Sequence, residues 1–448
     1  MLKETITAIS TPPGIGAVGI IRISGPSVKE ILSRVWISSQ NSVDKFITHR
    51  LYYGKICTRN RILDNVLAVY MEKPHSYTGE DVVEIHCHGG AVTTGLILEA
   101  VISSGARPAE PGEFTRRAFL NGKMDLIQAE AVADVINATT EQSLKLAQEQ
   151  LGGRLSEVIR SVQNRLKEIK AFVEATIDFP EEDIQFVENE KISLKLNEII
   201  TELKSLVSTY EEGRLIHDGT RVVIVGKPNV GKSSLLNRLL GTDRAIVHHE
   251  AGTTRDTIEE TLNLGGYLFR LIDTAGIRES DCEIEKIGIG RAKKRLVEAD
   301  LAVQLIDATS GFDENDRHVA EEIKKIKSIT VLNKIDIGKK DFIKSDLKLS
   351  AKTGEGMDEL KKRLIDFVES NSVTGSEGAI LTNLRHKKKA EDGLLWLEKA
   401  KESADKKESA EFIAYNLDEA MRNLGLITGE ITTEDVLNEI FSRFCLGK

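Results

Sequence analysis

The chain has 448 residues, which is more than one hydrophobic core normally organises, so its length predicts two or three domains. Hydrophobic residues make up 40% and charged residues 29%, and the net charge of −9 argues against a nucleic-acid-binding surface spread over the whole molecule. The four cysteines show no paired spacing, and no apolar run approaches the roughly 20 residues that span a bilayer. We therefore expect a reduced, cytoplasmic protein without a membrane segment.

The first 120 residues alternate short β-rich runs with glycine and proline turns. The runs cover residues 17–23, 66–71 and 82–86, and an amphipathic helix is expected near 90–103. This pattern predicts an N-terminal α+β domain over residues 1–120.

Helical periodicity replaces this pattern from about residue 125 to 213 and returns after about residue 380. Between them, residues 217–370 alternate strands and helices. The two helical stretches, 121–216 and 371–448, are expected to form one bundle into which the 217–370 domain is inserted. The predicted fold class is multidomain α/β and α+β, with a Ras-like P-loop domain inside a helical domain.

A phosphate-binding loop is predicted where the buried strand 221–225 meets the helix 234–240. The connecting residues, 226–233, read G-K-P-N-V-G-K-S, which is G-x-x-x-x-G-K-S in its required strand–loop–helix setting. Its glycines let backbone N–H groups close around phosphates at the helix N-terminus. Lys232 is expected to reach the β- and γ-phosphates, and the Ser233 hydroxyl to bind Mg²⁺.

Two further segments are expected to sense the γ-phosphate and the metal. Thr254 lies in G-T-T-R-D (252–256), and the strand 268–272 leads into D-T-A-G (273–276). Asp273 can hold the Mg²⁺ shell, while the Gly276 N–H can contact the γ-phosphate.

The choice of purine is predicted by N-K-I-D (333–336), which follows the strand run 329–332. The Asp336 carboxylate can accept hydrogen bonds from guanine N1–H and the 2-amino group, which adenine lacks. The segment S-A-K (350–352) can place a backbone N–H on guanine O6. Five such segments in order predict that the chain binds and hydrolyses Mg-GTP. The candidate GTP-binding residues are Asn229, Val230, Gly231, Lys232, Ser233, Ser234, His248, His249, Glu250, Ala251, Gly252, Thr253, Thr254, Asp273, Thr274, Ala275, Gly276, Asn333, Lys334, Asp336, Ser350, Ala351 and Lys352.

The position that follows D-T-A-G leaves catalysis open. Small Ras-like GTPases have a water-orienting glutamine there, and this chain has Ile277, which cannot act in that way. Another group must position water and neutralise the developing charge. The candidates are a second cation, an arginine or a nearby carboxylate: Arg255, Arg278, Glu279, Asp281, Glu283 and Glu285.

Three separated stretches resemble the MnmE/TrmE family of tRNA wobble-uridine modification GTPases. They are T-P-P-G with G-I-I-R-I-S-G (11–25), the S-Y-T-G-E-D to A-F-L-N region (76–121), and the terminal F-C-L-G-K (444–448). The motifs GKPNVGKSS, AGTTRD and DTAGIR match as well, so the resemblance covers essentially the whole chain.

This resemblance implies a homodimer whose N-terminal domain binds folate and mediates dimerisation. Family members act with an FAD-containing partner of the MnmG/GidA type, in a heterotetramer. Together they install an aminomethyl or carboxymethylaminomethyl group at C5 of the wobble uridine of certain tRNAs. The one-carbon unit comes from a 5-formyl- or methylene-tetrahydrofolate. The implied folate-binding residues are Arg22, Glu84, Lys123 and Lys448.

The same resemblance implies GTPase activation by dimerisation of G domains around K⁺. The implied K⁺ ligands are Asn229, Thr253 and the backbones of His248 and Glu250; the Mg²⁺ ligands are Ser233 and Thr254. Glu285 aligns with the family's water-orienting carboxylate, so the catalytic candidates become Glu285, Lys232 and Thr254.

Two alternative functions share the GTPase motifs. A ribosome-assembly GTPase of the Era/EngA-like class predicts an added RNA-binding domain, and residues 371–448 show no such pattern. A GTP-controlled scaffold without catalysis is disfavoured by the intact Lys232, Ser233, Thr254 and Asp273.

Two cysteine-containing segments can be interpreted either as functional sites or as ordinary structural residues. Cys445 is either a catalytic group near the folate site or an ordinary buried thiol. His86 and His88 share one face of a β-run while Cys87 points away, so no transition-metal site is predicted there.

Overall fold

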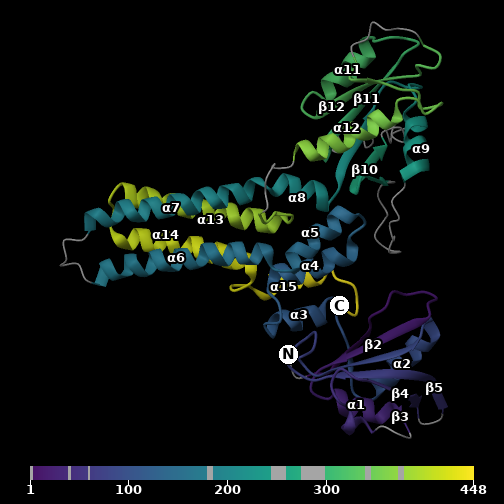
Figure 1. The fold of residues 1–448 in the computed structure, drawn as a ribbon, viewed down its shortest axis with the longest axis vertical. Coiled ribbons are helices and arrows are strands. Elements are labelled where there is room, and N and C mark those ends of the chain that lie inside the picture. The colour runs from purple at the N-terminus through teal and green to yellow at the C-terminus, as the bar shows by residue number, and fades with distance from the viewer. Residues whose placement is uncertain are drawn as a thin grey trace, which may run out of the picture. The chain divides into compact units, whose positions relative to one another are not determined.

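The computed structural model describes residues 4–38, 42–58, 61–178, 185–243, 259–273, 298–338, 345–371 and 378–448. The chain divides into two compact units. The first unit comprises Met1–Ala133 together with Leu424–Lys448, and the second comprises Asp134–Asn423 (Figure 1).

The first unit is built on a seven-stranded sheet of order β3-β4-β5-β6-β2-β1-β7, antiparallel except for the β1–β7 pair. The helices α1 and α2 pack on one face, where alternate strand residues such as Ile21 and Ile23 form the core. Residues between them, such as Arg22, point to the opposite face. The elements are β1 (Ile6–Ile9), β2 (Val18–Ser24), α1 (Val28–Val35), β3 (Trp36–Ile37), η1 (Val43–Lys45), β4 (Leu51–Thr58), β5 (Arg61–Met71), β6 (Val82–His88), α2 (Ala91–Ser103) and β7 (Arg107–Pro108). This α+β arrangement confirms the predicted class.

The last residues of the chain complete this first unit. Helix α15 (Glu434–Phe441) packs against α3 (Glu113–Leu120) and the start of α4 (Leu126–Asn137) in a separate apolar cluster. The terminal segment continues along the sheet, where the Phe114 N–H donates to the Lys448 carbonyl at 3.3 Å. Residues more than 300 positions apart in the sequence therefore share one core.

The second unit contains a bundle of long helices from both sides of the nucleotide-binding segment. Helix α7 packs against α13, and Lys170 of α6 pairs with Asp418 of α14 at 2.5 Å (Figure 1). The elements are α5 (Glu141–Leu151), α6 (Arg154–Asp178), α7 (Gln185–Ser208), α8 (Tyr210–His217), α13 (Leu384–Asp405) and α14 (Ala410–Thr428). The predicted insertion of a Ras-like domain within one helical bundle is confirmed.

The inserted domain has a six-stranded sheet of order β13-β12-β11-β8-β10-β9, in which β9 alone runs antiparallel to its neighbour. Its central strands are buried on both faces, as expected for parallel strands covered by helices. The elements are β8 (Thr220–Val225), α9 (Lys232–Asp243), β9 (Glu259–Leu264), β10 (Tyr267–Asp273), β11 (Leu301–Asp307), α11 (Glu314–Glu322), β12 (Lys327–Asn333), β13 (Leu347–Lys348) and α12 (Met357–Ser370).

Backbone contact is close where the chain leaves the inserted domain and re-enters the bundle. A Cβ on Gly213 of α8 would lie 2.1 Å from the Leu381 carbonyl oxygen, so only glycine fits there. The Leu381 N–H in turn donates to the Thr209 hydroxyl at 3.0 Å. The two chain connections to the inserted domain are thus held side by side.

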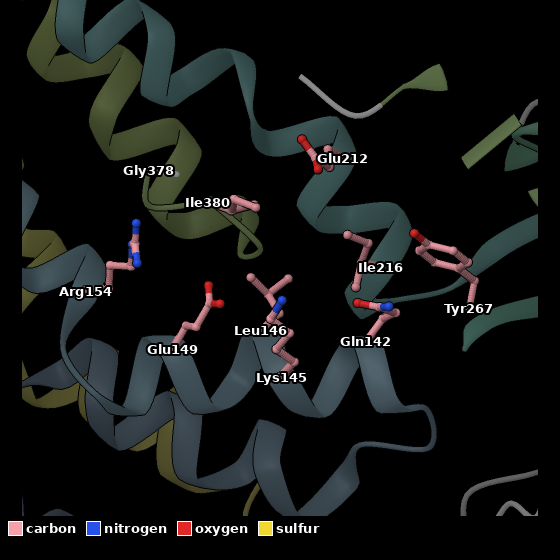
Figure 2. Close-up of a pocket in the computed structure, with 10 residues that line it drawn as sticks. All are labelled: Gln142, Lys145, Leu146, Glu149, Arg154, Glu212, Ile216, Tyr267, Gly378 and Ile380. Atoms are coloured by element: carbon pink, nitrogen blue, oxygen red, sulfur yellow. The ribbon is translucent and has the colours of Figure 1, made fainter. Parts of the chain in front are cut away.

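A polar groove of about 480 Å³ lies in the second unit beside these connections (Figure 2). It is lined by Lys145 and Glu149 of α5, Glu212 and Ile216 of α8, and Tyr267 of β10, among others. Burial raises the pKa of the Tyr267 phenol, and the charges of neighbouring glutamates raise it further. The ten residues that line the groove include none of those predicted to bind GTP or folate.

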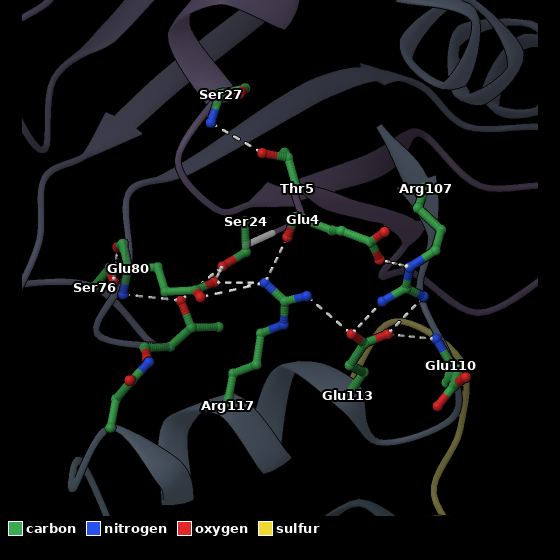
Figure 3. A network of polar contacts seen from close by, with 12 residues as sticks. Glu4, Thr5, Ser24, Ser27, Ser76, Glu80, Arg107, Glu110, Glu113 and Arg117 are labelled. Atoms are coloured by element: carbon green, nitrogen blue, oxygen red, sulfur yellow. Dashed lines mark hydrogen bonds and ion pairs between the residues drawn. The ribbon is translucent and has the colours of Figure 1, made fainter. Parts of the chain in front are cut away.

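An ion-pair network fixes the N-terminal strand of the first unit to α3 (Figure 3). Arg117 is almost fully buried, and its guanidinium donates to Glu80 at 3.0 Å, Glu113 at 2.9 Å and the Glu4 carbonyl at 2.9 Å. Arg107 binds the same Glu113 at 2.6 Å. Burial alone raises the pKa of Glu113, but hydrogen bonds led by that from Arg107 leave it below its ordinary value.

Replacing Arg117 is expected to destabilise the first unit strongly. Arg117→Met would leave the largely buried Glu80 carboxylate without its cation, while Glu113 would keep only Arg107. Removing one partner of a buried ion pair typically costs about 3–5 kcal/mol. Urea unfolding followed by Trp36 fluorescence, in a Trp396→Phe background, measures it. The exposed pair of Arg443 and Glu439 gives the control, since Arg443→Met should change stability by less than about 1 kcal/mol. Equal effects of the two variants would contradict the prediction.

The imidazole of His217, at the end of α8, bridges two carboxylates. Its Nε2 lies 3.0 Å from Asp134, and its Nδ1 lies 2.8 Å from Asp218, whose carbonyl also accepts from Arg270. The hydrogen bonds that the ring donates to Asp134 and Asp218 raise the pKa of His217 to about 10. Since this pKa is higher than in the unfolded chain, the stabilisation is complete below about pH 6.5 and is lost as pH rises towards 10.

A pH series should therefore separate wild type from His217→Gln. We expect the wild-type Tm to exceed that of the variant most at pH 6, and the difference to shrink steadily between pH 7 and 10. Differential scanning calorimetry of both proteins gives the two Tm curves. A Tm difference that stays constant over this range would refute the assignment of the charged imidazole.

Candidate functional site

The predicted phosphate-binding loop follows β8, which lies between β11 and β10 in the sheet. Loops at the carboxyl ends of central parallel strands are where such sheets bind ligands. Gly226, Asn229 and Gly231 have positive φ angles of 153°, 60° and 101°, so the loop takes backbone conformations that favour glycine. A Cβ on Gly231 would lie 2.3 Å from the Asn333 side-chain nitrogen, so glycine is required there.

The lysine of this loop is held by the loop itself. The Lys232 Nζ donates to the carbonyls of Gly226 and Lys227, both at 3.0 Å. Ser233 and Ser234 are exposed at the first turn of α9, where the helix leaves backbone N–H groups without helical partners. An anion at this position would meet an ammonium, two hydroxyls and the positive end of the helix.

A buried amide connects the three predicted nucleotide-binding loops. Asn333 is 2% exposed; its Nδ2 donates to the Val230 carbonyl at 2.8 Å, and its Oδ1 accepts from the Ala351 N–H at 3.0 Å. The three loops follow β8, β12 and β13, which run parallel in one sheet with β11 between β8 and β12. The phosphate-binding and base-binding candidates therefore belong to one site.

Two residues that follow Asn333 in the same loop, Lys334 and Asp336, have charged side chains. Lys334, at a φ of 67°, donates through Nζ to the Asn229 carbonyl and to Asp307, each at 2.7 Å. Burial raises the pKa of Asp307, but hydrogen bonds led by that from Lys334 lower it below its ordinary value. The exposed Asp336 carboxylate accepts from the buried Ser350 hydroxyl at 2.7 Å, which fixes its direction.

Part of the predicted site lies outside the described residues. This part comprises the whole segment 248–254, the triplet 274–276 and Glu285; of Asp273 only the backbone, at the end of β10, is described. The implied K⁺ ligands His248, Glu250 and Thr253, the Mg²⁺ ligand Thr254 and the catalytic Glu285 stay predictions.

Two of the predicted folate residues form an ion pair on the sheet face opposite α1 and α2. The Arg22 guanidinium binds Glu84 through Nε at 2.9 Å and Nη2 at 2.8 Å, across the β2–β6 pair. The rings of Tyr77 and Phe114 lie 5.3 and 5.6 Å from the same guanidinium. His86 adds a contact of 3.3 Å to the other Glu84 oxygen.

The two predicted lysines differ in their surroundings. Burial lowers the pKa of Lys448, and the charge of Arg22 lowers it further while Glu84 raises it, so this ammonium lies near the Arg22–Glu84 pair. Lys123 instead donates to the Pro74 carbonyl at 3.0 Å. The structure thus brings three of the four predicted folate residues into one neighbourhood, and Lys123 is placed by a different loop.

Several neighbours of the predicted residues were missed in the sequence. Asp307 binds Lys334, and the side chain of Lys227 in the phosphate-binding loop reaches Asp313. Tyr77 and Phe114 cover Arg22. Tyr77 and Phe114 lie inside the family motifs and were available as signals. Asp307 had no such signal. Lys227 lies inside the phosphate-loop motif, but its contact with Asp313 depends on how loops pack.

The histidine–cysteine run of β6 alternates as expected. Cys87 is buried, and burial together with the charge of Asp64 raises the pKa of its thiol to about 11. His88 binds Asp64 at 2.8 Å. Among the described residues, no three His, Cys, Asp or Glu side chains are grouped to hold a metal ion. The Cys445 side chain is exposed, so the buried-thiol alternative is wrong. Of the helices the structure describes, none combines the length and apolarity that a bilayer span requires.

Comparison with known proteins covers the whole chain. Residues 5–123 match the model of the GTP-binding protein TrmE N-terminus, and residues 126–445 match the MnmE helical domain. The chain is 46% identical to the tRNA modification GTPase MnmE of Carboxydothermus hydrogenoformans, with 100% of each chain covered. It is 44% identical to the protein of the same name from Acetivibrio thermocellus, with 100% of this chain and 99% of the relative covered.

Among solved structures, the chain is similar to the G domain of the FeoB iron transporter of T. maritima. The identity is 32% and the TM-score 0.25, over 33% of this chain and 98% of that one. The two family models together span both units, and the full-length relatives carry one name. The chain therefore belongs to the MnmE (TrmE) family.

Proposed function

We propose that this protein binds and hydrolyses Mg-GTP and that the hydrolysis cycle drives a tRNA modification. The observation that carries the proposal is the buried Asn333 amide, which connects the phosphate-binding loop to the loop of Ser350 and Ala351. Relatives identical at 41–46% of positions are named tRNA modification GTPases, in agreement with this site. The added RNA-binding domain expected of a ribosome-assembly GTPase is not part of the matched family models.

In this proposal each candidate residue has one task. Lys232 and the N–H groups of the 229–234 segment bind the phosphates, and Ser233, with Thr254 and Asp273, holds Mg²⁺. Asp336 accepts from guanine N1–H and the 2-amino group, and the Ser350 hydroxyl keeps its carboxylate oriented for that pairing. An N–H of the 350–352 segment contacts guanine O6.

Catalysis in this proposal uses a cation and a carboxylate in place of the missing glutamine. K⁺ is bound by the exposed Asn229 with His248, Glu250 and Thr253, at the interface of two G domains, while Glu285 orients the attacking water. A fixed cation near the phosphates stabilises the charge that builds up there.

Turnover of GTP in NaCl should fall well below turnover in KCl, and equal rates would exclude this role of K⁺.

The one-carbon chemistry is proposed for the first unit. A tetrahydrofolate derivative offers a pterin that pairs with the Glu84 carboxylate, and an anionic tail that suits the cations of Arg22, Lys448 and Lys123. The protein acts as a homodimer with an FAD-containing partner, and adds a carboxymethylaminomethyl or aminomethyl group at C5 of the wobble uridine. Analysis of tRNA nucleosides after loss of the protein tests this; a normal wobble uridine profile would refute it.

The domain organisation follows the same proposal. Residues 1–120 bind folate and dimerise, residues 121–216 and 371–448 form the helical domain, and residues 217–370 form the G domain.

Changing the base-binding carboxylate should change the nucleotide that is used. Asp336→Asn offers one acceptor and one donor in place of two acceptors, so it mismatches the guanine 2-amino group and matches the C2 carbonyl of xanthine. We expect the kcat/KM for GTP to fall about a hundredfold or more and that for XTP to rise. Steady-state turnover of the two nucleotides by both proteins measures this. An unchanged GTP preference would place the base elsewhere.

Removing the charge of the folate candidate should weaken folate binding without unfolding the unit. Glu84→Gln keeps the shape of the side chain but loses the charged partner of Arg22 and of the pterin, so we expect about a tenfold higher Kd for 5-formyltetrahydrofolate. Isothermal titration calorimetry measures it, and the exposed Glu30→Gln serves as the control. Equal affinities of both variants would remove Glu84 from the site.

A further inference from the structure

The side chain of Lys227, the second residue of the phosphate-binding loop, turns away from the loop's interior. Its Nζ donates to Asp313 at 2.8 Å, to Asp316 at 3.1 Å and to the Gly311 carbonyl at 3.3 Å. The Lys227 side chain is 12% exposed. These acceptors surround the N-terminus of α11, the helix that follows β11. One ammonium therefore connects the phosphate-binding loop to this helix.

The buried carboxylate of Asp316, at the start of α11, has Lys227 as its cation. Asp313 and Asp316 form a capping box, in which the backbone N–H of each residue donates to the side chain of the other. Asp316 is 0% exposed, and within the described part of the chain its Oδ1 has no hydrogen-bond partner. A fully buried carboxylate is costly unless a cation compensates it, and Lys227 is the cation that contacts it.

The other half of the loop is fixed from a different direction. The Lys334 Nζ donates to the Asn229 carbonyl, and the Asn333 Nδ2 donates to the Val230 carbonyl. The carbonyls of Gly226 and Lys227, which hold the Lys232 ammonium, belong to the first half, the one that Lys227 anchors. Without the Lys227 side chain, the first half of the loop loses its anchor, while the second half keeps its own.

We propose that Lys227 is a positioning residue for the nucleotide phosphates, acting through its anchorage on Asp313 and Asp316. It does not touch the nucleotide; it holds the first half of the loop in the conformation that phosphate binding requires. This inference rests on the proposed GTP site. A loop that is ordered before binding spares the nucleotide the entropic cost of ordering it, so the contribution appears in affinity.

The alternative is an ion pair that supports only the fold. Lys227→Met leaves Asp316 buried without its cation, so the single variant is expected both to lose stability and to bind weakly. Lys227→Met combined with Asp316→Asn removes the buried charge while an amide oxygen still accepts the capping bond. This double variant separates the two explanations, because it restores stability without restoring the anchor. Lys227→Arg, which keeps the charge, should rescue binding at least in part.

The experiment uses the full chain and two nucleotides. Fluorescence titration with the methylanthraniloyl derivative of GDP gives Kd, steady-state turnover of GTP gives kcat and KM, and thermal unfolding gives Tm. For the double variant we expect a Tm near that of wild type, Kd and KM raised about tenfold, and kcat within about threefold. Lys324→Met, at an exposed lysine near the end of α11 that pairs with Glu321, is the matched control and should bind like wild type.

Three results would overturn the positioning role of Lys227. A double variant that recovers wild-type Kd together with Tm would overturn the positioning role, and so would a Lys227→Met variant whose Kd stays within twofold of wild type. A fall in kcat at unchanged KM would also overturn it, because that pattern belongs to a group acting in the transition state. Failure of the wild-type protein itself to bind the GDP derivative would refute the proposed function and leave the anchor untouched as a structural contact.

Discussion

The nucleotide site depends on one buried primary amide. Asn333 donates through Nδ2 to the Val230 carbonyl and accepts at Oδ1 from the Ala351 N–H, and it is almost fully shielded from water. It thereby connects loops that follow different strands. An unsatisfied amide in such a place would be costly, so each loop is held where its bond to Asn333 is formed. The distance between the phosphate-binding and base-binding groups is thereby set by the sheet rather than by the ligand.

A second constraint is the way in which the inserted domain is attached. Both of its connections pass the same point of the bundle, where α8 and the segment around Leu381 approach too closely for any residue but glycine at 213. The charged His217 adds a bond from the end of α8 to Asp134 at the end of α4. A change of conformation in the inserted domain thus acts on the helices at one short junction, lined on one side by the polar groove.

The positions of site residues were predicted best where a sequence motif and the periodicity of the surrounding secondary structure agreed. The strand–loop–helix of residues 221–240 and the placement of Asn333 and Asp336 at a strand end followed from local pattern, since parallel strands bring such ends together. The resemblance named Arg22 and Glu84 for the same site, but their ion pair was not predicted, because nothing local says that β2 and β6 are neighbours. Lys123 shows the limit of that resemblance, since its contact with the Pro74 carbonyl depends on loop geometry. The anchorage of Lys227 on Asp316 joins residues 89 positions apart that share no motif, and only packing reveals it.

The position of the C-terminal segment has a consequence for the order of synthesis. Helix α15 and the terminal residues supply part of the apolar cluster that covers Leu126 and Ala129, and the Lys448 carbonyl accepts from the Phe114 N–H. The unit that leaves the ribosome first therefore lacks these partners until residues 434–448 have been made, by which time the whole of the inserted domain is already available to fold. During that interval the apolar α3–α4 surface lacks its cover, and a truncation before residue 434 would remove part of the core of the N-terminal unit.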